Sequence, residues 1–530
     1  MREIKSKINT QSVGFKNNYS KMLEKVSELE NLMEKSVWQG EEKYIERARK
    51  AGKLLARERI ELLLDQDTPY LDLLPFAGYG RKCFAMGGTM AAGIGLVNNK
   101  ICMIIANIAT IKGGAIDHVT LQKAMRLNEI AMENRLPVIY LVESAGANLT
   151  EQAKIFNYGG TNFREITRRS KEGITSISVV FGNSTAGGAY IPGMSDYVIM
   201  VRNQAKVFLA GPPLVKMATG EIVDDESLGG AETHSRISGV SDFLAEDEHD
   251  AIRLTRELMG VLNVNGDGRP PSEAEEPKYD ADEILGIVSE DLKKPYDVRE
   301  IIARLVDGSK FLEFKPDYGQ TLVTGFANIQ GHQVGIIANN GVLFSEAANK
   351  GAHFIQLCNK NNTPLIFLQN ITGFMVGKKY EHQGIIKDGA KMINAVSNST
   401  VPAITVMIGA SYGAGNYAMC GRAYQPRFLF SWPNSRIAVM GVDQLTGVME
   451  IIQKQAAKKI DLFKAAKGKL IKAKLTSDFE AQSNAFYATG QLWDDGVIDP
   501  RQTRNYLGMC LAIIYNSHFE GTNEYGVFRM

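Results

Sequence analysis

The chain has 530 residues, of which 44% are hydrophobic and 22% are charged, and its formal net charge is +1. This length is sufficient for about two to four domains with large apolar cores. Proteins that bind nucleic acid usually have a strong basic excess, and its absence here argues against that function.

Five cysteines are scattered along the sequence without a C-x-x-C pair. This pattern fits neither a disulfide framework nor a zinc ribbon, and it favours a reducing compartment. No apolar run reaches the roughly 20 residues of a membrane span. Residues 1–10 lack the features of a targeting peptide. We therefore expect a cytoplasmic protein with no membrane partner, or a mitochondrial one if a presequence has been removed.

The first predicted elements are helices. Apolar residues recur at helical spacing over 17–35 and in the same style over 44–64, among many charged residues. We expect these stretches to form a helical arm within residues 1–65. Arg57 and Arg59 are candidates to contact a phosphate, but a solvent-exposed helix face is the simpler interpretation.

The first α/β half extends from about residue 87 to 262. Residues 90–97 and 100–106 are predicted strands, and a helix is predicted over 119–134 after a Gly-rich turn at 112–115. The apolar run 138–143 is a predicted buried strand whose exit is rich in Gly and Ala. Such an exit lets a ligand approach the main chain closely, although it can equally be an ordinary helix start.

A second Gly-rich exit follows the strand predicted at 177–181. It covers residues 182–190, with the sequence GNSTAGGAY. A turn of this kind from strand into helix leaves backbone N–H groups without partners. Directed at a thioester or amide oxygen, these groups form an oxyanion hole. A single copy can also be a tight packing turn.

The region 265–280 contains Pro, Gly and many acidic residues without periodicity, and it is a predicted linker. We place a boundary near Pro271, which gives domains 1–270 and 271–530. A lysine-rich helix predicted over 448–475 has no counterpart in the first half. The predicted strands of the second half are 321–329, 333–339, 365–369, 403–408 and 435–440, and its main predicted helices are 344–358, 384–396 and 503–515.

The two halves form an internal repeat. The strand at 138–143 aligns with 365–370, and Gly182 aligns with Gly409, both 227 positions later. Residues 409–417, with the sequence GASYGAGNY, are therefore a second copy of the Gly-rich turn. Two copies in matching contexts favour a functional role, because they suggest two reactive oxygens to stabilise.

The chain resembles the carboxyltransferase (β) subunit of biotin-dependent acyl-CoA carboxylases, and most of all the methylcrotonoyl-CoA carboxylase branch. The resemblance covers essentially the whole chain. Its motifs are residues 52–60, 112–114, 133–137, 184–190, 208–216, 370–377, 413–422 and 492–500.

This resemblance implies an α/β fold of two tandem crotonase-like domains. It implies that the N-terminal domain holds the acyl-CoA thioester and the C-terminal domain holds biotin. By position, Gly187 and Gly188 would donate N–H groups to the thioester oxygen, and Ala414 and Gly415 to the ureido oxygen of biotin. Other expected acyl-CoA contacts are Lys112, Gly113, Gly114, Ser144, Ala145, Gly146 and Ala147, and other expected biotin contacts are Thr372, Gly373, Phe374, Tyr412 and Gly413.

The implied reaction moves CO2 from carboxybiotin to an acyl-CoA, first of all 3-methylcrotonoyl-CoA, an intermediate of leucine degradation. Biotin can accept the substrate proton, which agrees with the lack of a Ser/His/Asp set. The sequence has no Met-Lys-Met biotinylation site and no recognisable ATP-grasp loop. Biotin would therefore arrive on a partner α subunit, the biotin carboxylase and carrier. The resemblance implies a hexamer of this chain as the core of an α6β6 complex, and we expect no metal.

Three features depart from the methylcrotonoyl branch, all in the half expected to hold the acyl group: Ile108, Ala145 and residues 156–163. Geranyl-CoA or another acyl-CoA therefore stays open as the substrate. The subunit of a biotin-dependent decarboxylase would share the fold and run the transfer in reverse. A crotonase-like hydratase or isomerase would need no second turn, so the repeat argues against it.

Overall fold

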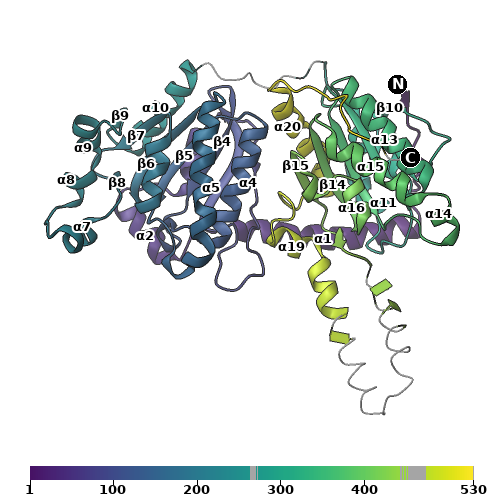
Figure 1. Ribbon diagram of the computed structural model, residues 1–530, viewed down its shortest axis with the longest axis horizontal. Helices are drawn as coiled ribbons and strands as arrows, with labels where there is room; N and C mark the ends of the chain where they lie inside the picture. The colour runs from purple at the N-terminus through teal and green to yellow at the C-terminus, as the bar shows by residue number, and fades with distance from the viewer. Residues whose placement is uncertain are drawn as a thin grey trace, which may run out of the picture. The chain divides into compact units, whose positions relative to one another are not determined.

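The computed structural model of the chain describes residues 1–262, 270, 272–441, 444–445, 447–448, 451, 473–474 and 476–528. Most of the predicted lysine-rich helix at 448–475 and part of the predicted linker lie outside these residues. Two compact units make up the chain (Figure 1). The N-terminal unit is Leu32–Arg269 with Ala512–Ser517, and the C-terminal unit is Met1–Asn31, Pro270–Leu511 and His518–Met530. The predicted helical arm is thus shared between the two units.

The arm consists of three helices, α1 (Val13–Ser36), α2 (Glu42–Lys50) and α3 (Ala56–Leu63). Met22, Val26 and Leu29 recur at helical spacing on α1 and are buried, as the apolar pattern predicts. The stretch predicted over 44–64 is interrupted after α2, where Gly52 adopts φ +70°, a left-handed conformation that ends a helix. Among the described helices, none combines the length and the apolarity that crossing a membrane requires.

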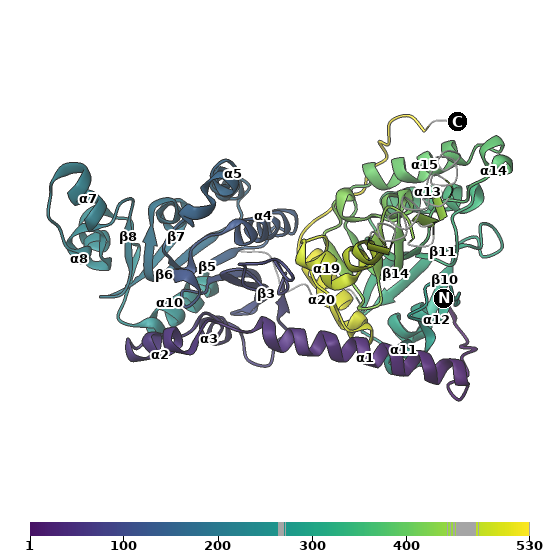
Figure 2. The ribbon, with the colours of Figure 1, turned by 90° about the horizontal axis from the view of Figure 1, so that it is seen from below.

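The N-terminal unit is built on one sheet with the strand order β2-β3-β4-β5-β6-β7-β9, and β8 pairs with the end of β6. The β2–β3 and β3–β4 pairs are antiparallel and the later pairs are parallel. Helices α4 (His118–Glu133) and α5 (Gln152–Lys171) cover one face, and α3 and α10 (Glu248–Val261) lie on the other (Figure 2). The strands are β2 (Leu71–Asp72), β3 (Met90–Val97), β4 (Lys100–Asn107), β5 (Val138–Ser144), β6 (Ser176–Thr185), β7 (Tyr197–Val201), β8 (Lys206–Phe208) and β9 (Phe243–Ala245).

The C-terminal unit has a second sheet, with the order β1-β10-β11-β12-β13-β14-β15 and with β16 paired to the end of β14. Helices α13 (Ser345–Lys360) and α15 (Ile385–Asn398) cover one face, and α11 (Ile284–Ile287) and α12 (Val298–Leu305) lie on the other (Figure 2). The final helix, α20, is Thr503–Tyr515. The strands are β1 (Arg2–Glu3), β10 (Lys310–Glu313), β11 (Leu322–Ile329), β12 (His332–Asn339), β13 (Leu365–Ile371), β14 (Ala403–Tyr412), β15 (Phe428–Ser431) and β16 (Arg436–Ala438).

The two sheets repeat one plan, which confirms the internal repeat and the predicted α/β fold. In each, an antiparallel hairpin is followed by parallel strands joined through helices. The register shifts at the same place in both sheets, between Val142 and Ser144 in one and between Gln369 and Ile371 in the other. Parallel strands covered on both faces are expected to be mainly apolar, as β5 and β13 are before the polar residues near their ends.

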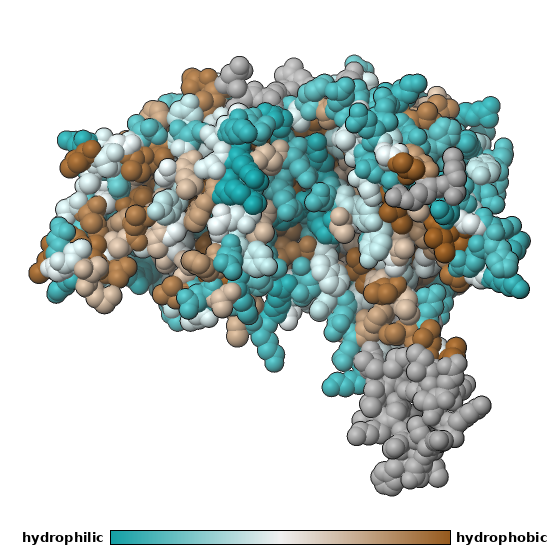
Figure 3. All heavy atoms as spheres, in the orientation of Figure 1, coloured by the Kyte–Doolittle hydropathy of each residue, from teal (hydrophilic) through white to brown (hydrophobic). Residues whose placement is uncertain are grey.

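One stretch of the N-terminal unit exposes several large apolar side chains around α7 (Pro212–Thr219). Figure 3 shows apolar side chains gathered over this part of the unit. Met217 and Ile222 are about four-fifths exposed, and Leu209 and Leu214 are about half exposed. Contiguous exposed apolar surface of this kind often marks a contact with another chain.

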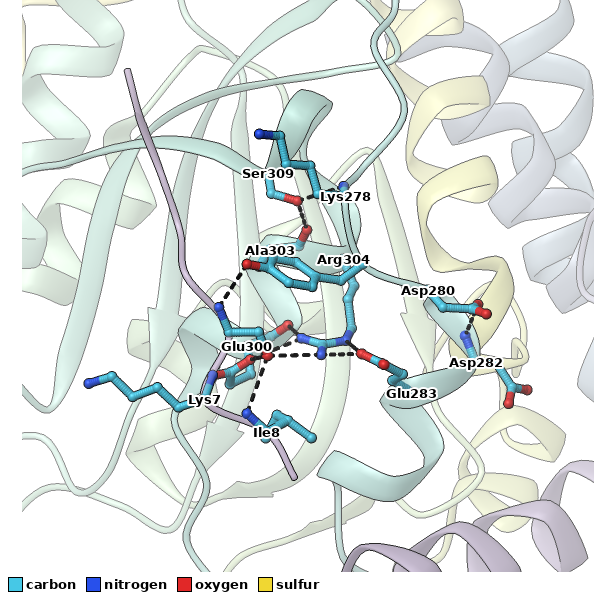
Figure 4. A network of polar contacts seen from close by, with 12 residues as sticks. Lys7, Ile8, Lys278, Asp280, Asp282, Glu283, Glu300, Ala303, Arg304 and Ser309 are labelled. Atoms are coloured by element: carbon cyan, nitrogen blue, oxygen red, sulfur yellow. Dashed lines mark hydrogen bonds and ion pairs between the residues drawn. The ribbon is translucent and has the colours of Figure 1, made fainter. Parts of the chain in front are cut away.

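In the C-terminal unit, a buried ion-pair network forms hydrogen bonds with the first residues of the chain (Figure 4). Arg304 on α12 is fully buried and donates to the carboxylates of Glu283 and Glu300. Glu300 in turn accepts from the Lys7 N–H at 2.8 Å and from the Ser6 hydroxyl at 2.6 Å. These bonds explain why the start of the chain belongs to this unit.

Candidate active site

The first Gly-rich turn lies where β6 ends. The chain passes through a short 3-10 turn, Ala186–Ala189, into α6 (Tyr190–Met194). Ala186 adopts φ +55°, and the Ser184 hydroxyl donates to the Gly188 carbonyl at 3.0 Å, which fixes the shape of the turn. Gly187 and Gly188 are among the first residues of this helical turn. N–H groups at these positions have no helical carbonyl behind them, so they are free to bind an acceptor.

Two neighbouring loops pack against this turn. The Ala145 N–H donates to the Gly113 carbonyl at 2.9 Å, and the Ile116 N–H donates to the Gly146 carbonyl at 2.8 Å, so the loops after β4 and β5 are hydrogen-bonded to each other. A Cβ placed on Gly188 would lie 4.0 Å from the Gly146 Cα. The structure therefore brings the predicted acyl-CoA loops and the predicted oxyanion turn to one place.

A mainly apolar cavity of about 270 Å³ opens beside the turn. Five of the residues predicted to contact acyl-CoA or its thioester line it: Ser144, Gly146, Ala147, Gly187 and Gly188. Phe156, Gly159 and Phe163 of α5, from the stretch that departs from the methylcrotonoyl branch, line it as well. Its remaining polar lining includes Asn107, Asn128, Tyr140, Gln152 and Asn162.

A second cavity of about 580 Å³ lies on the other side of the loop after β5, and Ser144 lines both. Gly113 and Ala145 also line this larger cavity. Its walls carry the cationic side chains of Arg47, Lys53, Arg59 and Lys206.

Two residues predicted to contact acyl-CoA line neither cavity. The Lys112 ammonium donates to the Cys83 carbonyl at 3.0 Å, so this side chain is engaged elsewhere. Gly114 has a packing role, because a Cβ there would lie 2.4 Å from the Glu143 carbonyl oxygen. Gly114 thus lets the loop after β4 approach the end of β5.

The interpretation of Arg59 as part of a solvent-exposed face was wrong. Only 2% of Arg59 is exposed, and it donates to Glu248 of α10 and to Glu143 of β5, each at 2.8 Å. The Arg59 guanidinium also lies 4.4 Å from the centroid of the Phe181 ring. Arg59 therefore fastens α3 to the sheet next to Ser144. Arg57, on the same helix, makes a more exposed pair with Asp72 at 3.0 Å.

The second Gly-rich turn lies where β14 ends, in the C-terminal unit. Gly413 adopts φ +55°, and its N–H donates to the Ala438 carbonyl at 3.0 Å. Helix α16 (Ala414–Ala418) then begins, with Ala414 and Gly415 at its first two positions. The Asn416 amide donates to the Ser411 hydroxyl at 2.8 Å, which helps to hold the turn.

The loop after β13 packs against this second turn as its counterpart does in the first unit. A Cβ on Gly415 would lie 3.4 Å from the Gly373 Cα, which matches the Gly188 and Gly146 pair. The Leu343 N–H donates to the Gly373 carbonyl at 3.2 Å, as Ile116 does to Gly146. Of the other predicted biotin contacts, Tyr412 pairs with Ala438 in the sheet, Thr372 is exposed, and the ring of Phe374 packs on Gly389.

Each unit also buries one lysine at an equivalent position. Lys123 on α4 and Lys350 on α13 are 227 residues apart, and burial lowers the pKa of each to about 8. The Lys123 ammonium donates to the Met90 carbonyl at 2.9 Å, at the start of β3. Met90 lines the apolar cavity, so Lys123 supports one of its walls.

Apart from Ser144, the sequence motifs did not identify the polar residues that line the apolar cavity. A repeated sequence, IIAN, does end at Asn107 and at Asn339. The side-chain oxygens of these residues accept the N–H groups of Glu143 and Asn370, at 3.3 and 3.2 Å. Within the described part of the chain, no cluster of His, Cys, Asp and Glu is arranged to hold a metal ion.

Comparison with known proteins agrees with this geometry. Residues 47–525 match the model of the carboxyl transferase domain. A Mycobacterium tuberculosis protein named as a probable biotin-dependent acyl-coenzyme A carboxylase beta2 subunit is 55% identical over 511 residues, which span 96% of each chain. A Drosophila melanogaster protein named as a probable mitochondrial methylcrotonoyl-CoA carboxylase beta chain is 49% identical over 99% of this chain and 95% of its own.

A solved structure gives the same result. The beta subunit of P. aeruginosa geranyl-CoA carboxylase superposes with a TM-score of 0.90 at 46% identity, and the match covers 99% of both chains. The chain belongs to the carboxyl transferase family.

Proposed function

We propose that this chain is the carboxyltransferase subunit of a biotin-dependent acyl-CoA carboxylase. In this proposal the domain of residues 1–270 binds the acyl-CoA, and the domain of residues 271–530 binds the biotin group of a partner subunit. The observation that carries the proposal is the duplicated turn, with Gly188 against Gly146 in one unit and Gly415 against Gly373 in the other. A transfer between two carbonyl-type oxygens needs one set of N–H donors for each oxygen.

In the N-terminal unit, the acyl chain would occupy the apolar cavity of about 270 Å³. The N–H groups of Gly187 and Gly188 would then stabilise the negative charge that develops on the thioester oxygen when the substrate loses a proton. On the other side of Ser144, Arg47 of the larger cavity is the candidate to contact the phosphates of coenzyme A, because Lys53, Arg59 and Lys206 of the same cavity pair with carboxylates. The loop at 144–147 would hold the thioester between the two cavities.

In the C-terminal unit, the turn would hold the ureido group of biotin. A Cβ on Gly415 would lie 2.5 Å from the Ile371 side chain and 3.4 Å from the Gly373 Cα, so glycine lets the turn pack closely against the loop after β13. When docked, the biotin group supplies the carboxyl group that is transferred. The N–H groups of Ala414 and Gly415 would stabilise charge on its ureido oxygen, and Thr372, Phe374, Tyr412 and Gly413 would border it.

The first candidate substrate is 3-methylcrotonoyl-CoA, because the sequence resembles that branch and the Drosophila melanogaster relative carries that name. Geranyl-CoA is the alternative, supported by the name of the solved structure. The choice depends on the cavity lining, because the residues of α5 that depart from the methylcrotonoyl branch lie there.

The proposed assembly is a hexamer of this chain that binds six biotin-carrying α subunits. The exposed apolar side chains around α7 support contacts between chains, because such surface is rare on proteins that act alone. All five cysteines are free thiols, which supports a cytoplasmic or other reducing location.

The test is to purify the chain with its biotinylated partner and to supply bicarbonate, ATP and a panel of acyl-CoAs. We expect carboxylation of at least one branched acyl-CoA, with kcat/KM identifying the acyl group. No carboxylation of any acyl-CoA by a complex whose partner is shown to be carboxylated would contradict the proposal.

A further inference from the structure

A buried arginine lies behind the polar part of the acyl cavity. Arg169, in the last turn of α5, has no measurable exposure. Its guanidinium donates to the Tyr140 hydroxyl and to the Asn128 side-chain oxygen, both neutral groups that line the cavity. Its Nε is buried without a hydrogen-bond partner, and among the described residues Arg169 makes no ion pair. Burying a charge without a counter-ion costs free energy, so the burial of Arg169 needs an explanation.

Arg169 fixes the direction of every hydrogen bond around it, because a guanidinium can only donate. Asn128 must therefore present its oxygen to Arg169, which directs its NH2 group to the Asn162 side-chain oxygen. That bond leaves the NH2 group of Asn162 free to donate.

The Tyr140 oxygen likewise accepts from Arg169, so its own proton is available to another acceptor. Burial raises the pKa of Tyr140, against the opposing effect of Arg169, and the hydroxyl keeps its proton at neutral pH. The groups that Tyr140 and Asn162 leave available at the cavity lining are thus both donors, and the positive charge of Arg169 is hydrogen-bonded to this network.

We propose that this cavity recognises an acyl chain whose far end carries a hydrogen-bond acceptor, best a carboxylate. The proposal rests on the proposed function and concerns which acyl-CoA the enzyme takes. A carboxylate would receive N–H and O–H donors from Asn162 and Tyr140 and would supply the counter-charge that Arg169 lacks. A purely hydrocarbon chain would leave the buried Tyr140 hydroxyl without an acceptor.

The carboxylate has two chemical sources. It can belong to the substrate, as in a dicarboxylic acyl-CoA. It can also be the group that the reaction adds. An enoyl chain that passes its γ proton to biotin would form the new C–C bond at that carbon, near the end of the chain, with the carboxyl carbon whose bond to the biotin nitrogen breaks. Both sources give an acyl chain with the same anionic end group.

The test compares two five-carbon ligands that differ only in the terminal carboxylate, glutaryl-CoA and pentanoyl-CoA. Their Kd values are measured by calorimetry on the purified oligomer. We expect glutaryl-CoA to bind at least about 10-fold more tightly, since a hydrogen bond to a charged group contributes this much or more. Equal binding, or tighter binding of pentanoyl-CoA, would overturn the inference. If neither ester nor free CoA binds, the proposed function itself fails.

Two variants test the residues. Arg169→Leu should reduce the ratio of the two Kd values to about one, and the control Arg168→Leu, at a side chain that is 58% exposed on the same helix, should leave it unchanged. Asn162 is only half-buried, so Asn162→Asp should fold even if Arg169→Leu does not. Its negative charge should abolish the preference for glutaryl-CoA. An unchanged ratio in folded Asn162→Asp or Arg169→Leu protein would contradict the proposal.

Turnover by the complete complex separates the two sources. If the complex carboxylates glutaryl-CoA with a higher kcat/KM than pentanoyl-CoA, the carboxylate belongs to the substrate. If glutaryl-CoA is not carboxylated but competes with 3-methylcrotonoyl-CoA, the donors serve the carboxyl group that the reaction adds.

Discussion

Asp494 is a carboxyl group that the fold holds completely away from water. It lies beside β15, where the Ser431 hydroxyl donates to it at 2.6 Å. Burial raises the pKa of Asp494 to about 6, although the hydrogen bonds from Ser431 and Thr489 oppose this. Because the folded pKa is above the unfolded value of about 3.9, ionisation favours the unfolded chain. This group therefore lowers the stability of the C-terminal unit as pH rises from about 4 to about 6, and the loss persists above pH 6.

We expect Asp494→Asn to raise the free energy of unfolding at pH 7 by on the order of 2 kcal/mol and to have little effect below pH 4. Urea unfolding between pH 4 and pH 8 measures this. Asp495→Asn is the control, and it should lower the free energy of unfolding. Asp495 accepts hydrogen bonds from Arg422 at 2.8 Å and from the Leu429 N–H at 2.9 Å, which the substitution would weaken. A stabilisation by Asp494→Asn that does not change with pH would contradict this explanation.

At the residue scale, the sequence identified the glycines of both turns, but it did not identify Arg169 and it placed Arg59 on an exposed helix face. The conformation of a Gly-rich turn is a local property, so a repeated motif is enough to locate Gly188 and Gly415. Burial of an arginine depends on partners far along the chain. Arg59 meets Glu248, 189 residues away, and Arg169 meets Asn128, 41 residues away. No local sequence pattern indicates these long-range contacts.

Among the elements, α3 and α10 are joined through Arg59, whose partner Glu143 immediately precedes Ser144 in β5. We expect Arg59→Leu to lower the free energy of unfolding by about 3–5 kcal/mol, because Glu143 and Glu248 would lose a buried partner. Arg57→Leu, on the same helix, should lower it by about 1 kcal/mol or less, because its pair with Asp72 is partly exposed. Denaturant unfolding of both variants measures the difference. An equal loss of unfolding free energy in both variants would contradict a larger contribution from the buried ion pairs of Arg59.

Most of the strands and helices predicted from the apolar periodicity are present, with boundaries that agree to within a few residues. Helices α5 and α10 and strand β15 were not among the predicted elements. The strand predicted at 333–339 is His332–Asn339, and the helix predicted at 344–358 is Ser345–Lys360. The arm was less predictable, because its apolar spacing continues across Gly52 and only the left-handed φ of that residue shows the break. The cavities could not be predicted, since their walls combine segments far apart in the sequence. The apolar cavity combines the loops after β4, β5 and β6 with helix α5. The larger cavity combines the loops after β4 and β5 with helices α2 and α3.

For the whole molecule, the proposal places biotin and the ATP-dependent step on the partner subunit. The purified chain should neither bind streptavidin nor hydrolyse ATP with bicarbonate, and both properties should appear only when the biotinylated partner is added. A streptavidin blot and a phosphate-release assay measure this. Covalent biotin on the isolated chain would contradict the proposal of separate subunits.

The central claim is that each unit stabilises one oxygen, and proline substitution tests it because proline removes a single N–H group. Gly188→Pro removes one N–H group on the acyl-CoA side. Gly188→Ala keeps the N–H and adds a Cβ that has ordinary contact, 3.8 Å from the Ser184 hydroxyl. On the biotin side Ala414→Pro is the sharper choice, because residue 414 already carries a Cβ and proline suits the first position of a helix.

The decisive measurement is CO2 release from the carboxylated partner without acyl-CoA, alongside full carboxylation, in variants with unchanged oligomer size and thermal stability. We expect Gly188→Pro and Ala414→Pro each to reduce carboxylation by about 100-fold or more, the usual effect of one oxyanion donor. Gly188→Ala should reduce it far less. Gly188→Pro should retain CO2 release without acyl-CoA, and Ala414→Pro should lose it. Equal loss of that release in both proline variants would contradict the assignment of one oxygen to each unit.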